Sequence, residues 1–287
     1  MKIFIPEKAK EGLGGGHTFT RNIMKALHDE VQFVDSWKEA DVYFIPGPTL
    51  SERDEVKEAK REGKKVVLRV DNVPRNSRNR NTSTSRLYDF AQMADEVIYQ
   101  SHWARAFVSP FTGRGGVVIL NGVDTSIFSE DGNKRQRQGK PQYLYSQYSS
   151  DPTKQWHQAW YKFQNTFYAN KDAHLWIVGR AEFFGKNQEE YHFDFFGGAE
   201  KRYSYFGLIE DLKEMAEIYR SADVMLLPYF ADACSNTAIE ARMCGMELEY
   251  DSDGGGGTHE LRMADKKELT LEVMGKKYVK VFQKVLG

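Results

Sequence analysis

Two acidic side chains flank a loop of small polar residues in the second half of the chain. Asp232 and Glu240 are separated by seven residues, and the loop between them contains Ser235, Asn236 and Thr237. A small-residue loop that enters a helix presents backbone N–H groups and the positive helix end, so this loop suits a diphosphate. Glu240, one turn into the helix, could accept hydrogen bonds from two neighbouring ribose hydroxyls.

The same residues also form a helix-capping pattern. Thr237 and Glu240 have the spacing of a capping box, in which the Glu240 carboxylate accepts a hydrogen bond from the Thr237 backbone N–H. That arrangement needs no ligand. The segment alone therefore leaves nucleotide binding and helix capping open.

A glycine-rich segment near the N-terminus, GLGGGHTF over residues 12–19, opens a helical pattern. The candidates for a loop whose backbone meets a diphosphate or an acceptor are Gly14, Gly15, Gly16 and His17. One alternative is a flexible turn. Another is a dinucleotide-binding fingerprint, which Asp35 after an apolar run would support, although His17 occupies its third glycine position.

An arginine-rich stretch, VVLRVDNVPRNSRNRNTSTSR, covers residues 66–86. Its arginines are Arg69, Arg75, Arg78, Arg80 and Arg86. One interpretation is a basic loop on the acceptor side that becomes ordered on binding, and the other is an exposed polar loop. No aromatic residues are interleaved to support nucleic-acid binding.

The elements that must position these residues alternate along the chain. Strands are predicted at 2–5, 31–34, 42–45, 65–70, 96–100, 117–120, 143–147, 174–179, 203–207 and 224–228. Helices are predicted at 18–28, 51–61, 88–94, 102–108, 153–168, 211–222, 237–244 and 269–286. Such alternation indicates parallel, doubly wound sheets.

A stretch without apolar residues, GNKRQRQGKPQ over 132–142, interrupts this pattern and is predicted to be a linker. Two α/β halves therefore meet there. Open α/β sheets bind ligands at the carboxyl ends of their strands, so we expect the ligand in a cleft between the halves.

Composition argues against several classes of protein. The 40 Lys and Arg residues balance 41 Asp and Glu residues, which does not indicate a general nucleic-acid binder. No run approaches the roughly 18 apolar residues of a membrane span, and the start MKIFIP has no secretory character, so we expect a cytoplasmic protein. Cys234 and Cys244 lack a His-rich partner motif for zinc and are predicted to be small core residues.

The segment ADVMLLPYFADACSNTAIEARMCG, residues 222–245, resembles the retaining glycosyltransferases of family 4, which have the GT-B fold. The family's signature of an acid, seven residues and a glutamate matches Asp232 and Glu240. Ala241 and Gly245 fit its E-A-x-x-x-G helix. The family usually has Glu first, and Asp232 is one methylene shorter.

Further landmarks of the family occur in the same order along the chain. Similar segments are ADEVIYQSHWARAFV at 94–108, LNGVDTSIF at 120–128 and GLIEDLKEMAEIYRSADVMLLP at 207–228. In SQYSSDPTKQW at 146–156, Lys154 matches the lysine of the family's donor-phosphate clamp. No arginine matches its partner, and Arg180 is the candidate replacement.

The resemblance implies roles for these residues. Lys154 and the amides of Ser235–Thr237 would neutralise the leaving diphosphate, Asp232 would position the donor sugar and Glu240 the ribose. Asp71, at a strand end where many members carry a cleft His or Asp, would lie near the reacting centre. No metal or other cofactor is expected to be obligatory, because the positive charge comes from Lys154 and a helix end.

The architecture implied is GT-B, two facing Rossmann-like domains with parallel sheets. Residues 1–138 would bind the acceptor, 139–270 would bind the nucleotide sugar, and 271–287 would form a helix returning toward the first domain. The reaction would transfer a sugar, with retention, from a nucleoside-diphosphate sugar to a glycan, a lipid-linked sugar or another hydroxyl compound. Nucleic acid is not expected as a partner, and peripheral membrane contact stays open.

Two other functions stay open. One is a different GT-B enzyme acting on sugar nucleotides, such as an epimerase or a phosphorylase. The other is a non-catalytic sugar-nucleotide-binding protein, because the clamp arginine is absent and the chain is short for the family.

Overall fold

The structure is a computed structural model of the chain, and it describes residues 1–12, 14–73, 81–147, 152–179, 202–251 and 255–287. These residues divide into two compact units. Unit 1 comprises Met1–Asp124, Asp232–Asn236 and Gly256–Gly287, and unit 2 comprises Thr125–Ala231 and Thr237–Gly255.

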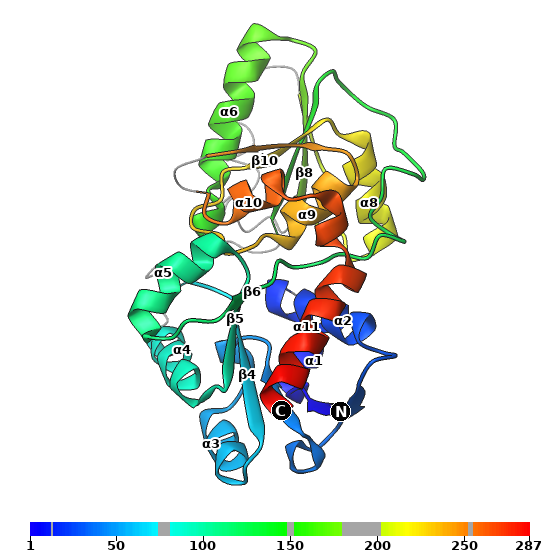
Figure 1. Cartoon of the computed structure of the whole chain (residues 1–287). Helices are drawn as coiled ribbons and strands as arrows, with labels where there is room; N and C mark the ends of the chain where they lie inside the picture. The colour runs from blue at the N-terminus through cyan, green and yellow to red at the C-terminus, as the bar shows by residue number, and fades with distance from the viewer. Residues whose placement is uncertain (13, 74–80, 148–151, 180–201, 252–254) are drawn as a thin grey trace. The chain divides into compact units, whose positions relative to one another are not determined.

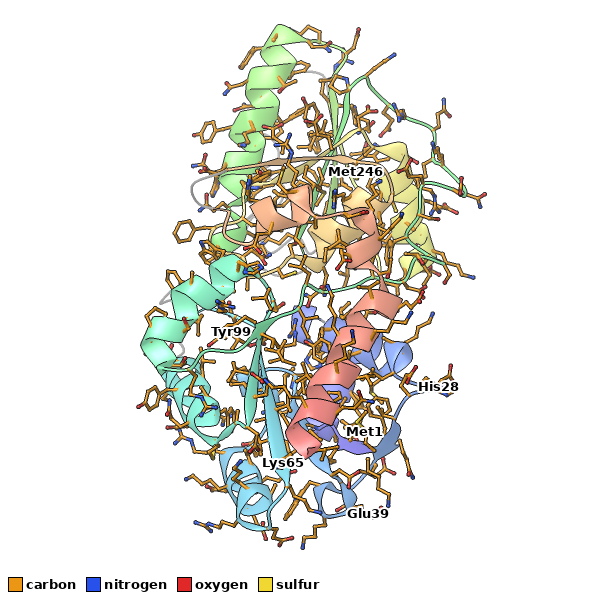
Figure 2. All side chains as sticks on the ribbon, viewed as in Figure 1. Met1, His28, Glu39, Lys65, Tyr99 and Met246 are labelled. Carbon is orange, nitrogen blue, oxygen red and sulfur yellow. The ribbon has the colours of Figure 1, made fainter. Side chains whose placement is uncertain are left out.

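The described residues of unit 1 build a six-stranded parallel sheet in the order β2-β1-β3-β4-β5-β6. Its strands are β1 (Lys2–Phe4), β2 (Gln32–Val34), β3 (Val42–Ile45), β4 (Lys65–Val70), β5 (Glu96–Tyr99) and β6 (Val117–Val118). In Figure 2, Lys65 marks the amino end of β4 and Tyr99 the carboxyl end of β5. The carboxyl ends of these parallel strands therefore lie at the upper edge of the sheet in that view.

Helices cover both faces of this sheet (Figure 1). The α-helices of unit 1 are α1 (Glu7–Lys10), α2 (Gly15–Ala26), α3 (Arg53–Arg61), α4 (Asn81–Met93), α5 (His102–Thr112), α10 (Thr258–Met263) and α11 (Leu271–Leu286). Short 3₁₀ turns lie at Trp37–Glu39, Pro48–Leu50 and Lys266–Leu269. Helices α2 and α11 pack together on one face, and α3, α4 and α5 lie on the other.

The core of unit 1 joins the sheet to α2 and α11 through aromatic rings. The ring of Phe44 on β3 lies 5.7 Å from that of Tyr278 and 5.5 Å from that of Phe282, both on α11. Phe19 on α2 lies 5.7 Å from Tyr278. The helical spacing of Tyr278 and Phe282 places both on the face that meets the sheet. The helix begins where the Thr270 side chain accepts a hydrogen bond from the Val273 N–H.

The described residues of unit 2 form a five-stranded parallel sheet in the order β11-β10-β7-β8-β9. Its strands are β7 (Gln142–Gln147), β8 (His174–Gly179), β9 (Tyr203–Tyr205), β10 (Val224–Leu227) and β11 (Glu247–Tyr250). The helices are α6 (Trp156–Ala169), α8 (Leu212–Ser221) and α9 (Asn236–Met243), with a 3₁₀ turn at Pro152–Lys154. Figure 1 shows α6 and α8 on opposite sides of the sheet. The predicted alternation of strands and helices is confirmed.

Several predicted helices begin at other residues in the structure, and α4 and α6 are two of them. The polar stretch 66–86 was expected to be a loop at its C-terminal end, but α4 already begins at Asn81. The buried face of this helix is visible in the sequence only from Leu87 and Phe90 onward, so its polar first turns carry no apolar periodicity. Helix α6 begins at Trp156 rather than Thr153, because Gln155 has a left-handed backbone with φ of 49°.

Candidate functional site

In unit 1, Asp71 follows directly after β4, at the carboxyl end of the sheet. A Cβ atom added to Gly47 would lie 2.5 Å from Asp71 Oδ2, so a side chain at this position would displace the Asp71 carboxylate. A Cβ added to Gly16, in the first turn of α2, would lie 3.8 Å from the same oxygen. The structure therefore brings two sequence-predicted candidates, Asp71 and the glycine segment, together.

The glycine segment is shorter as a loop than expected. Gly14 is the N-cap residue of α2 with φ of 116°, and Gly15, Gly16 and His17 already belong to the helix. His17 Nδ1 lies 3.3 Å from the Ala9 carbonyl oxygen. The helix therefore presents the backbone of Gly15 and Gly16 at its positive end.

The loop Asp232–Asn236 is held at three successive carbonyls. The Asp232 carbonyl accepts from the Gly257 N–H at 2.7 Å. The Ala233 carbonyl accepts from Ser101 Oγ at 2.7 Å, and that of Cys234 from Asn121 Nδ2 at 3.4 Å. Within the loop, Asp232 Oδ1 accepts from the Cys234 N–H at 3.2 Å. The loop backbone is thus fixed by groups of unit 1.

The thiols and the neighbouring serine are buried. Neither Cys234 nor Cys244 forms a disulfide, and both are buried, as predicted for core residues. Burial raises the pKa of the Cys234 thiol to about 12, so it is protonated near neutral pH. Ser235 is 5% exposed. The small side chains of the loop thus serve its packing, and its backbone is the part suited to a ligand.

In unit 2, Lys154 ends the 3₁₀ turn before α6. Its ammonium nitrogen lies 3.7 Å from the centroid of the Tyr229 ring. The Tyr229 hydroxyl donates to the Ser146 carbonyl at 2.5 Å, and the Tyr145 hydroxyl donates to the Lys154 carbonyl at 3.2 Å. The lysine predicted from sequence is therefore held by two aromatic residues of its own unit.

Glu240 has a partner that the sequence did not indicate. Its carboxylate accepts a hydrogen bond from the Tyr219 hydroxyl on α8, at 3.2 Å. Burial raises the pKa of the Glu240 carboxyl to about 7, and the bond from Tyr219 opposes that rise. A carboxylate has about four lone-pair sites, so this bond leaves room for further donors.

The capping-box interpretation of Glu240 is wrong. Helix α9 begins at Asn236, one residue before Thr237. Among the described residues, the Glu240 carboxylate bonds to Tyr219 and not to the Thr237 N–H. The physical reason is the start of the helix: with Asn236 already helical, Thr237 lies inside the first turn and is not its cap.

Arg69 is also placed differently from expectation. It was grouped with the arginines of a basic or polar loop, but it lies in β4, within the predicted strand 65–70, and is 2% exposed. Arg86 lies in α4 and donates to the Ser51 carbonyl at 3.2 Å. Arg75, Arg78, Arg80 and the predicted donor-binding Arg180 lie outside the described residues.

The sequence did not single out Asn121, Tyr219 or Tyr229, and it indicated Arg69 only as a member of the arginine-rich stretch. Asn121 and Tyr219 lie within segments that resemble the family, and Tyr229 follows the proline that ends β10. The sequence therefore offered a signal for these three positions. It offered none for their contacts, because each partner is distant along the chain.

In the part of the chain that the structure describes, no group of three or more His, Cys, Asp or Glu residues could hold a metal ion. None of the described helices has the length and apolar composition needed to span a membrane.

Comparison with known protein families gives a match over part of the chain. Residues 151–247 match the family model Glycosyl transferases group 1, and that range contains Lys154, Asp232 and Glu240. No curated protein matches the sequence significantly.

Solved structures cover nearly the whole chain. The Anabaena protein Alr3699/HepE in complex with UDP-glucose has a TM-score of 0.67 at 14% identity, covering 99% of this chain and 98% of that one. The sucrose-phosphate synthase of Thermosynechococcus elongatus has a TM-score of 0.59 at 14% identity, covering 99% and 96%. The pneumococcal O-GlcNAc transferase GtfA in complex with UDP and GlcNAc has a TM-score of 0.59 at 13% identity, covering 96% and 61%.

At these identities the likeness establishes the fold. The chain is an α/β protein with the GT-B fold of glycosyltransferases, and each unit contributes one parallel sheet. The fold predicted from sequence is confirmed.

Proposed function

We propose that the chain is a retaining glycosyltransferase that moves a sugar from a nucleoside-diphosphate sugar to an acceptor hydroxyl. One observation carries the proposal: Lys154, Asp232 and Glu240 all lie within the range that matches the glycosyltransferase model. Solved structures with the same fold contain UDP-glucose, or UDP and glucose, which supports uridine nucleotides as the first ligands to test.

The chemistry requires positive charge where the diphosphate leaves. Lys154 would supply it from its place over the Tyr229 ring. The backbone N–H groups of Ser235–Thr237 and the positive end of α9 would add to it. With charge from these sources, the mechanism has no need of a metal ion.

The remaining candidates would orient the donor and the acceptor. Asp232 would accept hydrogen bonds from the donor sugar, and Glu240 from the ribose. Asp71, beside Gly16 and Gly47, would lie near the reacting centre, where we assign it no nucleophilic role. The backbone of Gly14–Gly16 and the adjoining His17 would face the diphosphate or the acceptor.

A thermal-shift panel tests donor binding. UDP-, GDP-, ADP- and dTDP-sugars are compared at equal concentration with NAD. A ligand that binds only the folded chain stabilises it by RT ln(1 + [L]/Kd), which is about 2.7 kcal/mol at a hundredfold excess over Kd. We expect at least one sugar nucleotide to raise Tm and NAD to leave it unchanged. The proposal is lost if NAD alone raises Tm.

Turnover separates an enzyme from a binding protein. The sequence 146–156 contains no arginine to partner Lys154, which favours a non-catalytic sugar-nucleotide-binding protein as the second candidate. Donor hydrolysis, or transfer to an acceptor panel, is followed by NMR of the anomeric proton. Retained configuration supports the proposal, and inverted configuration contradicts it. Tight binding with no release of nucleoside diphosphate supports the second candidate.

A further inference from the structure

Arg69 is a buried cation in an interior strand of the unit 1 sheet. It is 2% exposed, whereas arginine is almost never fully buried unless paired. Its guanidinium donates to the Pro46 carbonyl at 2.8 Å, to Gln100 Oε1 at 2.6 Å and to Asn121 Oδ1 at 3.1 Å. Among the described residues these bonds all end on neutral oxygens. The guanidinium also lies 3.6 Å from the centroid of the Phe19 ring.

The guanidinium fixes the orientation of both side-chain amides. Because it has donors only, Gln100 and Asn121 must turn their oxygens toward it. Their nitrogens then point elsewhere. Gln100 Nε2 donates to the Val70 carbonyl at 2.8 Å. Asn121 Nδ2 lies 3.0 Å from Gln100 Oε1 and 2.9 Å from Asn236 Oδ1.

Asn121 thereby reaches the loop Asp232–Asn236 from inside unit 1. Its Nδ2 lies 3.4 Å from the Cys234 carbonyl, in addition to its bond to Asn236. The loop packs closely against Gly257. A Cβ added to Gly257 would lie 2.2 Å from the Ala233 carbonyl oxygen and 2.8 Å from Ser101 Oγ. Asn121 and Ser101 are 3% and 0% exposed, so water does not replace these bonds readily.

Holding the carbonyls also orients the amide donors. In a trans peptide the C=O and the next N–H point in opposite directions. The carbonyls of Ala233 and Cys234 bond toward Ser101 and Asn121, so the N–H groups of Cys234 and Ser235 point away from those residues. Cys234 N–H meets the Asp232 carboxylate, which fixes that side chain too.

We propose that Arg69 is a positioning residue that acts through Asn121 to hold the loop Asp232–Asn236 in the conformation that binds the donor. The inference rests on the proposed function, in which this loop contacts the donor. Arg69 itself touches no ligand. It acts because a donor-only group forces Asn121 to present its nitrogen, and not its oxygen, to the loop.

The decisive variant is Asn121→Asp. It keeps the shape of the side chain and an oxygen for Arg69, now in an ion pair, but replaces the Nδ2 donor by an acceptor. The Cys234 carbonyl loses its bond, and Asn236 Oδ1 loses its donor. We expect hydrogen exchange of the amides in 233–237 to accelerate by about tenfold, and UDP binding to weaken by about tenfold. Exchange is measured by mass spectrometry and binding by calorimetry.

Two further variants keep the test falsifiable if one folds poorly. Arg69→Met removes the donor-only group, and we expect the same acceleration of loop exchange. Arg114→Met is the matched control, because Arg114 donates to the Ala94 carbonyl at 2.8 Å, at the amino end of β5. It should change neither loop exchange nor UDP affinity. The free energy of unfolding of each variant is measured in urea. It shows whether faster loop exchange merely follows a loss of overall stability.

The outcomes separate this inference from the proposed function. Wild-type loop exchange in a folded Asn121→Asp variant overturns the inference, whatever UDP does. Equal acceleration in Arg69→Met and Arg114→Met also overturns it, because the effect then follows general stability. If loop exchange accelerates in the variants but the wild-type chain binds none of UDP, GDP, ADP and dTDP, the loop positioning stands and the proposed function is lost.

Discussion

The ammonium nitrogen of Lys154 lies 3.7 Å from the centroid of the Tyr229 ring. Tyr229 is 2% exposed, and its hydroxyl bond to the Ser146 carbonyl keeps the ring from turning away. A cation over a desolvated aromatic ring gains about 2 kcal/mol. Ordering a free lysine costs up to about 2 kcal/mol of side-chain entropy. The ring therefore offsets much of the cost of holding Lys154 in place for a diphosphate.

The first prediction concerns this pair. Tyr229→Leu removes the ring and should lower kcat by about tenfold, since 1.36 kcal/mol corresponds to a factor of ten. Tyr229→Phe keeps the ring and should lose less, although it loses the bond to Ser146. Lys154→Ala should lower kcat by about a hundred- to a thousandfold. The measurement is kcat at saturating donor.

The control is the Tyr229→Leu change in a chain that lacks the Lys154 ammonium. In a Lys154→Ala background, Tyr229→Leu should have no further effect on kcat if the ring acts through the lysine. Equal losses from Tyr229→Leu in both backgrounds would show that the ring acts on something else.

The sequence predicted the elements best where an apolar run is fully buried. HLWIVG is β8 with the predicted bounds, and its six residues are all buried. A continuous apolar run of this kind is typical of a buried strand in a parallel sheet. The start of α9 was less predictable. This helix begins at Asn236 rather than at the Thr237 that local spacing favoured, and the Asn236 side chain accepts a tertiary hydrogen bond from Asn121.

Only part of the candidate site could be predicted from the sequence. Asp71 and Gly16 were named separately, and their proximity follows from parallel strands that end at one edge. The burial of Arg69 could not be predicted, because its partners Gln100 and Asn121 lie in other segments of the chain. Polar networks depend on the geometry of the whole fold, whereas apolar periodicity is local.

The second prediction concerns metal ions. If Lys154 and the N-terminus of α9 supply the charge at the diphosphate, no bridging cation is needed to stabilise the leaving group. EDTA should therefore leave kcat within about twofold of its value without chelator. Initial rates are measured before and after dialysis against EDTA, with MnCl₂ added back to a parallel sample. Abolition of activity by EDTA with full recovery in manganese would contradict this mechanism.

The third prediction uses His174 as a pH-dependent element of unit 2. Burial, and then the charge of Arg202, lower the pKa of the His174 imidazole to about 4. Its Nε2 lies 3.1 Å from Ser204 Oγ. Because the folded-state pKa is below the ordinary value, the unfolded chain binds the proton more readily. Stability should therefore be full above about pH 6.5 and decline as the pH falls toward about 4.

The His174 effect is measured as a difference between two proteins. At pH 5 the loss should approach about 2 kcal/mol in the free energy of urea unfolding, since each pKa unit is worth about 1.4 kcal/mol. His174→Gln cannot titrate and can still bond to Ser204, so it should lack this component. Identical slopes of stability against pH in the two proteins would contradict the prediction.

The last prediction concerns Glu240, whose carboxyl has a pKa raised to about 7, chiefly by burial. Because this folded-state pKa lies above that of the unfolded chain, Glu240 favours the folded state below about pH 4.5. That contribution is lost as the pH rises to about 7. Donor binding should respond in the opposite direction. Ribose hydroxyls donate to the ionised carboxylate, so affinity for the sugar nucleotide should increase through about pH 7 and then level off.

Calorimetry with a sugar nucleotide tests this prediction, because its diphosphate, esterified at both ends, does not titrate near neutral pH. At pH 8.5 Glu240→Gln should weaken binding by about ten- to a hundredfold, the value of a hydrogen bond to a charged group. The variant should also show a flat pH profile. Tyr219→Phe is the companion variant: it removes a bond that lowers the pKa of Glu240, so the rise in affinity should move to higher pH. Wild-type affinity in Glu240→Gln at pH 8.5 would remove Glu240 from the site and leave its bond to Tyr219 as a purely structural contact.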